Sequence, residues 1–217
     1  MDPHEDDKRI RTVRLTPAGL AERDLLERRS DELARSFLEP LSESRRKRLV
    51  AAMAEVERLL TVALVEITAI DPGHRDAQLC VRGYFAELGR RFDTGFDPGL
   101  SISAELHDLR PPAGMFLIAR LRAEPVGCGA LKFHGDEPTE LKRMWVAESA
   151  RGLGIGRRLL TELEKRAAAA GARVVRLETN KSLTEAISLY RSAGYREVEA
   201  FNEEPYAHHW FEKRLDA

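Results

Sequence analysis

The sequence has little of several features that mark specialised classes of protein. It holds two cysteines in 217 residues, Cys80 and Cys128. That is too few for a disulfide framework or for a structural zinc site built from cysteines. No apolar run approaches the roughly 18 residues that a membrane span needs, and the charged start MDPHEDDKRI lacks the apolar stretch of a signal peptide. We therefore expect a cytoplasmic protein that does not enter a membrane.

An excess of charge of one sign is also missing. Lys and Arg number 35 and Asp and Glu number 36, so the formal net charge is −1. Bulk charge therefore does not favour binding to a polyanion. Hydrophobic residues make up 43% of the chain, which is enough for a packed core. No cluster of metal-ligating residues stands out, and we expect no metal.

Residues 1 to 63 form a charged, helical segment in this interpretation. Thr16 and Pro17 predict a helix start, as an N-cap and a first-turn proline, and Pro40 predicts its end. In a second helix, apolar residues recur at spacings of four, three and four: Leu49, Met53, Val56 and Leu60. Such stripes must be buried against something. The rest of the chain and a second copy of it both remain open as partners.

Residues 64 to 217 alternate short apolar runs with helical patterns. We expect strands over 65–70, 115–122, 126–133, 140–146, 174–179, 195–198 and 207–213. We expect helices over 74–92, 156–170 and 183–193, with a short one over 103–109. This order is typical of an α+β fold with a mixed sheet, and it lacks the regular alternation of a doubly wound fold.

A glycine-rich turn joins the strand that ends at Val146 to the helix that begins near Gly156. The first turn of a helix offers unpaired N–H groups and a partial positive charge, and glycines let the backbone approach an anion closely. A diphosphate is the expected ligand. A Walker loop is excluded because two arginines follow the last glycine, and a dinucleotide turn is disfavoured because the glycines are each two residues apart. A turn without any ligand stays open as an alternative.

From Glu140 to Tyr195 the chain resembles the GNAT superfamily of acyl-CoA N-acyltransferases. Arg151-x-x-Gly154-x-Gly156 matches the pyrophosphate signature of that superfamily. Further matches are Val146, Asn180, Ala186, Tyr190, Gly194 and Tyr195. The resemblance covers residues 64–217 and implies a GNAT fold, α+β with a mixed, centrally splayed sheet. It also implies acetyl-CoA as co-substrate, and transfer of an acetyl group to a primary amine of a small molecule or peptide by direct attack in a ternary complex.

The same resemblance implies where the co-substrate would lie. It assigns the strand end, the turn, the first helical turn and one residue of the next strand: Met144, Trp145, Val146, Arg151, Gly152, Leu153, Gly154, Ile155, Gly156, Arg157 and Asn180. Arg157 or Arg158 would add charge at the diphosphate, with a solvated helix face as the alternative. For Asn180 the alternative is a helix N-cap, a position for which Ser182 is better placed.

Two residues are expected to move protons. Tyr190 matches the tyrosine that protonates the departing thiolate in GNAT enzymes, with a core tyrosine as the alternative. Some GNAT enzymes carry a basic glutamate at this point of the strand, so the resemblance implies Glu140 as the general base. Strand alternation assigns Glu140 to the same face as Lys142, Met144 and Val146. Its alternative is an ion pair with Lys142 or Arg143.

Acceptor contacts in this fold come from the first helices and the last strands. The candidates are Phe92, Phe96, Tyr206 and one of His208 and His209. Adjacent histidines on a strand point to opposite faces, so the two do not form a metal site. The identity of the amine is not predicted.

Residues 5–60 resemble the wing and the dimerisation helices of a MarR-type winged-helix regulator. The match is carried by Asp7-Lys8-Arg9 and by the stretch Val13 to Gly19. Such regulators dimerise through the helices that follow the wing, so the resemblance implies a homodimer. The helix-turn-helix that would precede the wing is absent from this sequence, so we expect the segment not to bind DNA. Two alternatives to an enzyme remain: an acyl-CoA-binding sensor and a MarR-type transcriptional regulator, both without turnover.

Overall fold

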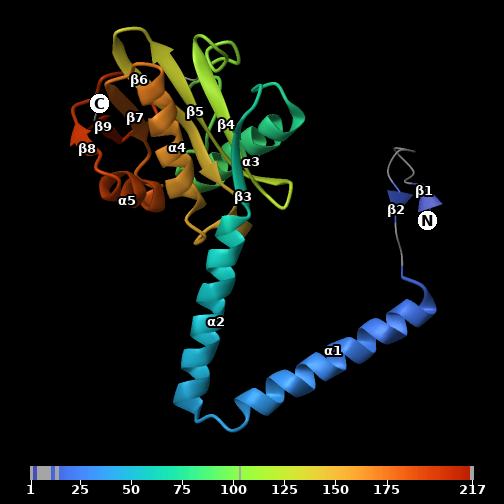
Figure 1. Cartoon of the computed structure of the whole chain (residues 1–217). Helices are drawn as coiled ribbons and strands as arrows, with labels where there is room; N and C mark the ends of the chain where they lie inside the picture. Colours follow the sequence, from blue (N-terminus) through green and yellow to red (C-terminus); the bar gives the residue numbers. More distant parts are fainter. Residues whose placement is uncertain (1, 4–10, 13–14, 103, 216–217) are drawn as a thin grey trace. The chain divides into compact units, whose positions relative to one another are not determined.

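The computed structural model describes residues 2–3, 11–12, 15–102 and 104–215 (Figure 1). The chain divides into two compact units, residues 1–56 and 57–217. The division falls within helix α2 (Glu43–Ala63), whereas the domain boundary expected from the sequence lies at the end of that helix.

The start and the end of the first helix follow the predicted signals. Helix α1 (Pro17–Leu38) begins after Thr16, whose Oγ1 accepts a hydrogen bond from the N–H of Gly19 at 3.1 Å. The chain leaves the helix just before Pro40, which has no N–H to continue it. Strands β1 (Asp2–Pro3) and β2 (Arg11–Thr12) pair antiparallel. The other residues of the predicted wing, 4–10 and 13–14, lie outside the described residues.

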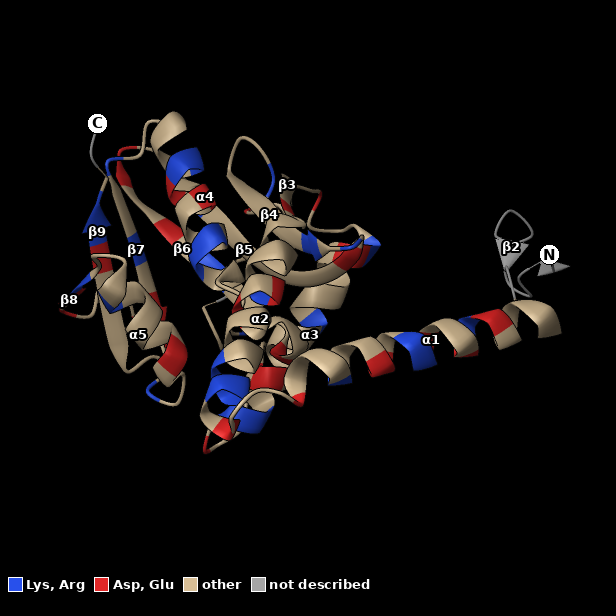
Figure 2. Ribbon diagram, turned by 60° about the horizontal axis from the view of Figure 1, so that its bottom comes forward, with Lys and Arg blue, Asp and Glu red and all other residues tan. Residues whose placement is uncertain are grey.

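Helices α1 and α2 contain no buried residue, although every position in both is described. Acidic and basic residues are both distributed along α1 (Figure 2). The apolar stripes of both helices are exposed: Leu20, Leu26, Leu33 and Phe37 on α1, and the predicted Leu49, Met53, Val56 and Leu60 on α2.

The second unit contains a seven-stranded sheet, in the order β3-β4-β5-β6-β7-β9-β8 (Figure 1). The strands are β3 (Val65–Ala69), β4 (Gly114–Leu121), β5 (Glu124–His134), β6 (Glu137–Val146), β7 (Val174–Thr179), β8 (Arg196–Val198) and β9 (His209–Arg214). All neighbours pair antiparallel except β6 and β7, which are parallel. The predicted α+β fold with a mixed sheet is confirmed.

Three α-helices and one short 3-10 helix pack around this sheet. They are α3 (Arg75–Arg91), α4 (Ile155–Ala169), α5 (Thr184–Ser192) and the 3-10 helix η1 (Glu148–Ala150). The helix predicted over 103–109 is wrong, because the described residues there form turns. One cause is Asp108, whose carboxylate accepts from the N–H of Glu105 at 2.9 Å and so competes with helical pairing. Among the described residues, no helix is both long and apolar enough to cross a bilayer.

The core has two parts, one on each face of the sheet. On one face α3 packs on β4 and β5 through Ala77, Cys80, Val81, Phe116, Ile118, Cys128 and Ala130. On the other face α4 and α5 pack through Leu117, Leu131, Leu141, Leu159, Leu163, Leu177, Ile187 and Phe211. Full burial of such a side chain contributes about 1.5–3 kcal/mol, so all three helices are held on the sheet by this packing.

Strands β6 and β7 separate soon after they meet. Their pairing is confined to Thr139–Val175 and Glu140–Arg176, so the two strands diverge toward the end of β6 at Val146. This is the splayed sheet that the resemblance implies. The divergence opens the sheet between α3 and α5, which lie on either side of it.

A β-bulge in β6 reverses the predicted alternation of its side chains. Cys128 of β5 lies opposite Trp145, and Ala130 lies opposite Lys142, so two residues of β6 face Gly129 alone. Arg143 takes up the extra length with a φ of +54°. Lys142 therefore faces the α3 side with Ala130, whereas Met144 packs on the α4 side.

The predicted common face of Glu140, Met144 and Val146 is therefore wrong. Leu141 belongs to the core on the α4 side, which leaves Glu140 on the α3 side. Beyond the bulge, Met144 and Val146 pack on the α4 side and Trp145 on the α3 side. Strict period-two alternation holds only for an unbroken strand.

Candidate active site

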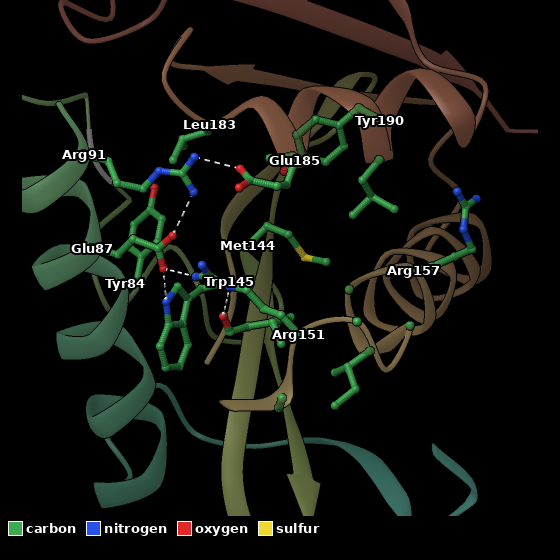
Figure 3. Close-up of a pocket in the computed structure, with 18 of the residues that line it drawn as sticks. Tyr84, Glu87, Arg91, Met144, Trp145, Arg151, Arg157, Leu183, Glu185 and Tyr190 are labelled. Carbon is green, nitrogen blue, oxygen red and sulfur yellow. Dashed lines mark hydrogen bonds and ion pairs between the residues drawn. The ribbon is translucent and has the colours of Figure 1, made fainter. Parts of the chain in front are cut away.

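A cavity of about 420 Å³ opens where β6 and β7 separate (Figure 3). Its walls come from α3, the end of β6, the glycine-rich turn, the first turn of α4, and α5. Ten of the predicted site residues line it: Met144, Trp145, Val146, Arg151, Gly152, Gly154, Ile155, Gly156, Arg157 and Tyr190. Leu153 packs against the core, and Asn180 lies at a second cavity described below.

The glycine-rich turn leaves space where side chains would otherwise stand. Gly152 and Gly154 both have a φ of +77°, and a Cβ on either would meet no atom within 4 Å. Only glycine adopts this backbone conformation at little cost. Gly154 is the N-cap of α4, whose first turn has no acidic residue. Because the N–H groups of that turn lack helical partners, the site fits an anion such as a diphosphate.

The three arginines around the turn have different surroundings. Arg151 donates from Nε to the carbonyl of Val146 at 3.1 Å, which fastens the turn to the strand end. Arg157 lines the cavity and donates to Ser192 Oγ at 2.5 Å. Arg158 instead donates to backbone carbonyls at the end of α2 and the start of β3. Of the two arginines expected to add charge, Arg157 alone lies at the cavity.

An ion-pair network on one wall was not predicted from the sequence. Glu87 of α3 is buried, accepts from Trp145 Nε1 at 2.9 Å and pairs with Arg151. Arg91 forms two ion pairs: its Nη1 lies 3.2 Å from Glu87 Oε1, and its Nη2 lies 2.7 Å from Glu185 Oε2 on α5 (Figure 3). The one signal in the sequence was the spacing of four between Glu87 and Arg91 on a predicted helix. The other partners are too distant along the chain to be paired by any local pattern.

Two tyrosines, Tyr190 and Tyr84, line the first cavity. Tyr190 is 5% exposed and packs against the rings of Tyr195 and Phe211. Burial raises the pKa of the Tyr190 hydroxyl, so the phenol stays protonated at neutral pH. Tyr84 of α3 also lines the cavity, and burial raises its pKa too. Tyr84 was not singled out from the sequence, where it is one aromatic residue in a helical pattern.

A second, smaller cavity of about 70 Å³ adjoins the first, since Tyr84, Leu88 and Leu183 line both. Three aromatic residues predicted at the acceptor site meet here: Phe92, Phe96 and Tyr206. The ring centroids of Phe96 and Tyr206 are 4.9 Å apart.

The structure does not bring the two histidines to either cavity. His208 is exposed. His209 lies 2.5 Å from Glu197 and stacks on Phe211.

Asn180 joins the end of β7 to the loop before β9. Its Nδ2 donates to the carbonyl of Tyr206 at 2.7 Å, and its Oδ1 accepts from the N–H of Ser182 at 2.9 Å. Helix α5 has Leu183 as its N-cap, without a side-chain hydrogen bond. The alternatives in which Asn180 or Ser182 caps this helix are therefore wrong.

Glu140 lies outside both cavities, in a group of buried charges. Its carboxylate is 3.3 Å from Lys142, 3.0 Å from Arg176 and 3.5 Å from His134. Burial by itself would raise the pKa of Glu140, but Lys142, Arg176 and His134 outweigh it and the pKa is lowered. A carboxylate held ionised by cations is a weak base. Among the described residues, no group of three or more His, Cys, Asp or Glu is arranged to hold a metal ion.

A family model described as "Acetyltransferase (GNAT) family" matches residues 84–195. That range is about half of the chain and contains the cavity-lining segments of α3, β6, α4 and α5. The chain belongs to the GNAT acetyltransferase family.

Three proteins similar to this GNAT acetyltransferase illustrate the match. An "IAA acetyltransferase" of Azospirillum brasilense is 42% identical over 92 residues, which are 42% of this chain and 60% of that protein. An uncharacterised N-acetyltransferase of Schizosaccharomyces pombe is 29% identical over 133 residues, 60% of this chain and 80% of that protein. A Klebsiella pneumoniae structure described as an acyl-CoA N-acyltransferase superposes with a TM-score of 0.60 at 28% identity, covering 71% of this chain and 99% of that one. The chain thus aligns with 60% of the length of the Azospirillum relative.

Proposed function

We propose that the protein is an acetyl-CoA-dependent N-acetyltransferase that acts on a primary amine. The observation that carries this proposal is the cavity at the β6–β7 divergence. One end is a helix N-terminus with two left-handed glycines, suited to a diphosphate, and the other end continues into a second cavity. A donor with a diphosphate at one end and a reacting thioester at the other fits this arrangement.

The thioester supplies an activated acetyl group. The ammonium form of the amine first loses a proton to solvent. The neutral nitrogen then bonds to the carbonyl carbon, the carbon–sulfur bond breaks, and a second proton passes from the nitrogen to solvent. We propose that Tyr190 donates its hydroxyl proton to the departing thiolate and recovers it from water. At the bulge, Arg143 and Met144 lie outside the register of strand pairing. We propose that a backbone N–H group there polarises the thioester carbonyl.

Calorimetric titration with acetyl-CoA tests the co-substrate site. Gly154→Trp fills the space in front of the first turn of α4, and we expect binding to be lost. Gly171→Trp is the matched control, since Gly171 has a φ of +91° and open space but lies at the opposite end of α4. Equal loss of binding in both variants would count against an anion site at Gly154.

Release of free thiol in the presence of a panel of amines tests the reaction. Binding of acetyl-CoA without thiol release for any amine would favour the alternative, an acyl-CoA-binding sensor. Release that depends on the amine would establish the transferase.

We further propose that residues 1–63 form a homodimer, in the manner of the MarR-type dimerisation helices they resemble. The proposal rests on the apolar stripes of α1 and α2, which are exposed in a single chain. A second copy would remove these stripes from water. The cytoplasmic location stays a prediction from the composition.

A further inference from the structure

The second cavity carries an unbalanced negative charge. Two carboxylates line it, Glu178 and Glu204, and its lining contains no Lys, Arg or His. Glu178 is neutralised by Lys142, whose Nζ lies 2.5 Å from its Oε1. Glu204 is different. Among the described residues, no cation lies within ion-pair distance of Glu204.

Neutral groups hold the Glu204 carboxylate in place. Its Oε2 accepts from the hydroxyl of Ser101 at 2.9 Å and from the N–H of Ile102 at 2.6 Å. Its Oε1 accepts from the N–H of Tyr206 at 3.2 Å. Glu204 is only 7% exposed. A carboxylate that is buried without a counter-charge is costly unless a ligand supplies one.

Aromatic rings lie beside this carboxylate. Phe92, Phe96 and Tyr206 line the same cavity, with ring centroids 4.9 to 5.8 Å apart. The faces of aromatic rings attract organic cations, and a nearby carboxylate adds to the attraction. A ligand carboxylate would instead meet Glu204 without any cation in the lining to receive it.

We infer that the acceptor is a cationic amine with an apolar or aromatic body and no carboxylate, bound between Glu204 and the rings of Phe92, Phe96 and Tyr206. This inference rests on the proposed acetyl transfer and narrows its acceptor class. Amino acids and other acceptors that carry a carboxylate are disfavoured by like-charge repulsion. The junction lined by Tyr84, Leu88 and Leu183 would let such an amine reach the first cavity.

The test compares ligands that differ in one group. 2-Phenylethylamine and phenylalanine share a ring and an amine, and only phenylalanine has a carboxylate. 2-Phenylethanol lacks the positive charge. Each is titrated into the 217-residue chain with and without CoA, so that binding is measured without turnover. We expect 2-phenylethylamine to bind at least about tenfold more tightly than either of the others.

Glu204→Gln keeps the side-chain shape and removes the charge, and should reduce the preference over 2-phenylethanol and phenylalanine to about threefold or less. Glu203→Gln is the matched control, because the neighbouring Glu203 is exposed and should leave the preference unchanged. The affinity of each variant for acetyl-CoA reports whether it is folded.

Three results would overturn the inference: phenylalanine binding as tightly as 2-phenylethylamine, no binding of the amine, or an unchanged preference in a folded Glu204→Gln variant. If that variant does not fold, the comparison of ligands on the wild-type protein still decides. Failure to bind acetyl-CoA would count against the transferase proposal instead, and so would the absence of thiol release with every amine tested. Thiol release with phenylalanine but not with 2-phenylethylamine would keep the transferase and refute this acceptor class.

Discussion

At the scale of single residues, Tyr190 is the group whose surroundings best suit proton donation. Its ring is held by packing, and burial keeps its hydroxyl protonated at neutral pH. We expect Tyr190→Phe to retain the fold and the affinity for acetyl-CoA but to lower kcat by about 100-fold. Because the Tyr190 pKa is raised, loss of its proton should not limit kcat below about pH 10.

The control for this variant is Tyr195→Phe. Tyr195 is buried beside Tyr190 but does not line either cavity. Steady-state kinetics and calorimetry on both variants check the prediction. A similar fall in kcat for Tyr195→Phe, or none for Tyr190→Phe, would show that the Tyr190 hydroxyl is not the proton donor.

Glu140 is predicted to stabilise the fold rather than to act as the base. Glu140→Gln removes the anion from between Lys142 and Arg176, and should lower the free energy of unfolding by about 2–4 kcal/mol at pH 7. The lowered pKa of Glu140 means that its stabilisation is present above the pKa of an unfolded carboxyl, about 4.3. It is lost as the pH falls through the folded pKa. The variant should therefore differ less from wild type at pH 3.5 than at pH 7.

Denaturant unfolding at the two pH values measures this effect. Glu137→Gln is the control, because Glu137 lies on the same strand but is 73% exposed and 4.0 Å from Arg176. A kcat that falls 100-fold in Glu140→Gln, with little loss of stability, would restore Glu140 as the base.

The predicted residues that line the first cavity share a local signal. The glycine-rich turn was predictable because strand, glycines and helix follow one another within about 15 residues. The roles of Glu204 and Glu87 were not predictable. Glu204 is notable because it lacks a cationic partner within the described part of the chain, and Glu87 because it pairs with Arg91, Arg151 and Trp145. Tertiary packing decides both. The predicted orientation of Glu140 was wrong for another reason. Arg143 adopts a positive φ that its residue type does not signal, so the bulge was invisible in the sequence.

At the scale of elements, the shape of the first cavity depends on how α3 and α5 are held on either side of the opening in the sheet. Most helix and strand positions could be predicted from apolar periodicity, but the contacts of Arg91 that link these two helices could not. Arg91 on α3 bonds to Glu87, to Glu185 and to the carbonyl of Ser182 at 2.6 Å. These contacts preorganise the cavity walls.

We expect Arg91→Met to weaken acetyl-CoA binding by about tenfold. Without the Arg91 contacts, part of the binding free energy would be used to order the cavity walls on α3 and α5. Glu185→Gln should have a smaller effect, under about fivefold, since Glu185 is 70% exposed and a solvated ion pair contributes little. Arg191→Met is the control, because Arg191 lies on α5 but pairs with Glu197. Calorimetric titration with acetyl-CoA measures these affinities. Equal affinities for wild type and Arg91→Met would show that the contacts of Arg91 have no role in binding.

At the scale of the whole molecule, all residues that line the two cavities belong to the compact unit 57–217. The apolar stripe of α1 belongs to the other unit. If α1 and α2 form a homodimer, the dimer should be separable from catalysis. Leu33→Glu places a charge in the stripe, and we expect it to convert the dimer to a monomer with kcat and KM within about twofold of wild type.

Sedimentation velocity over a range of protein concentrations measures the assembly. Arg28→Glu is the matched control, since at 100° per residue position 28 lies on the opposite side of α1 from Leu33; it should leave the dimer intact. A wild-type protein that stays monomeric at roughly 100-fold above its working concentration would refute the dimer. A monomeric Leu33→Glu variant without activity would instead show that the site requires a second copy, although every residue lining the cavities comes from one chain.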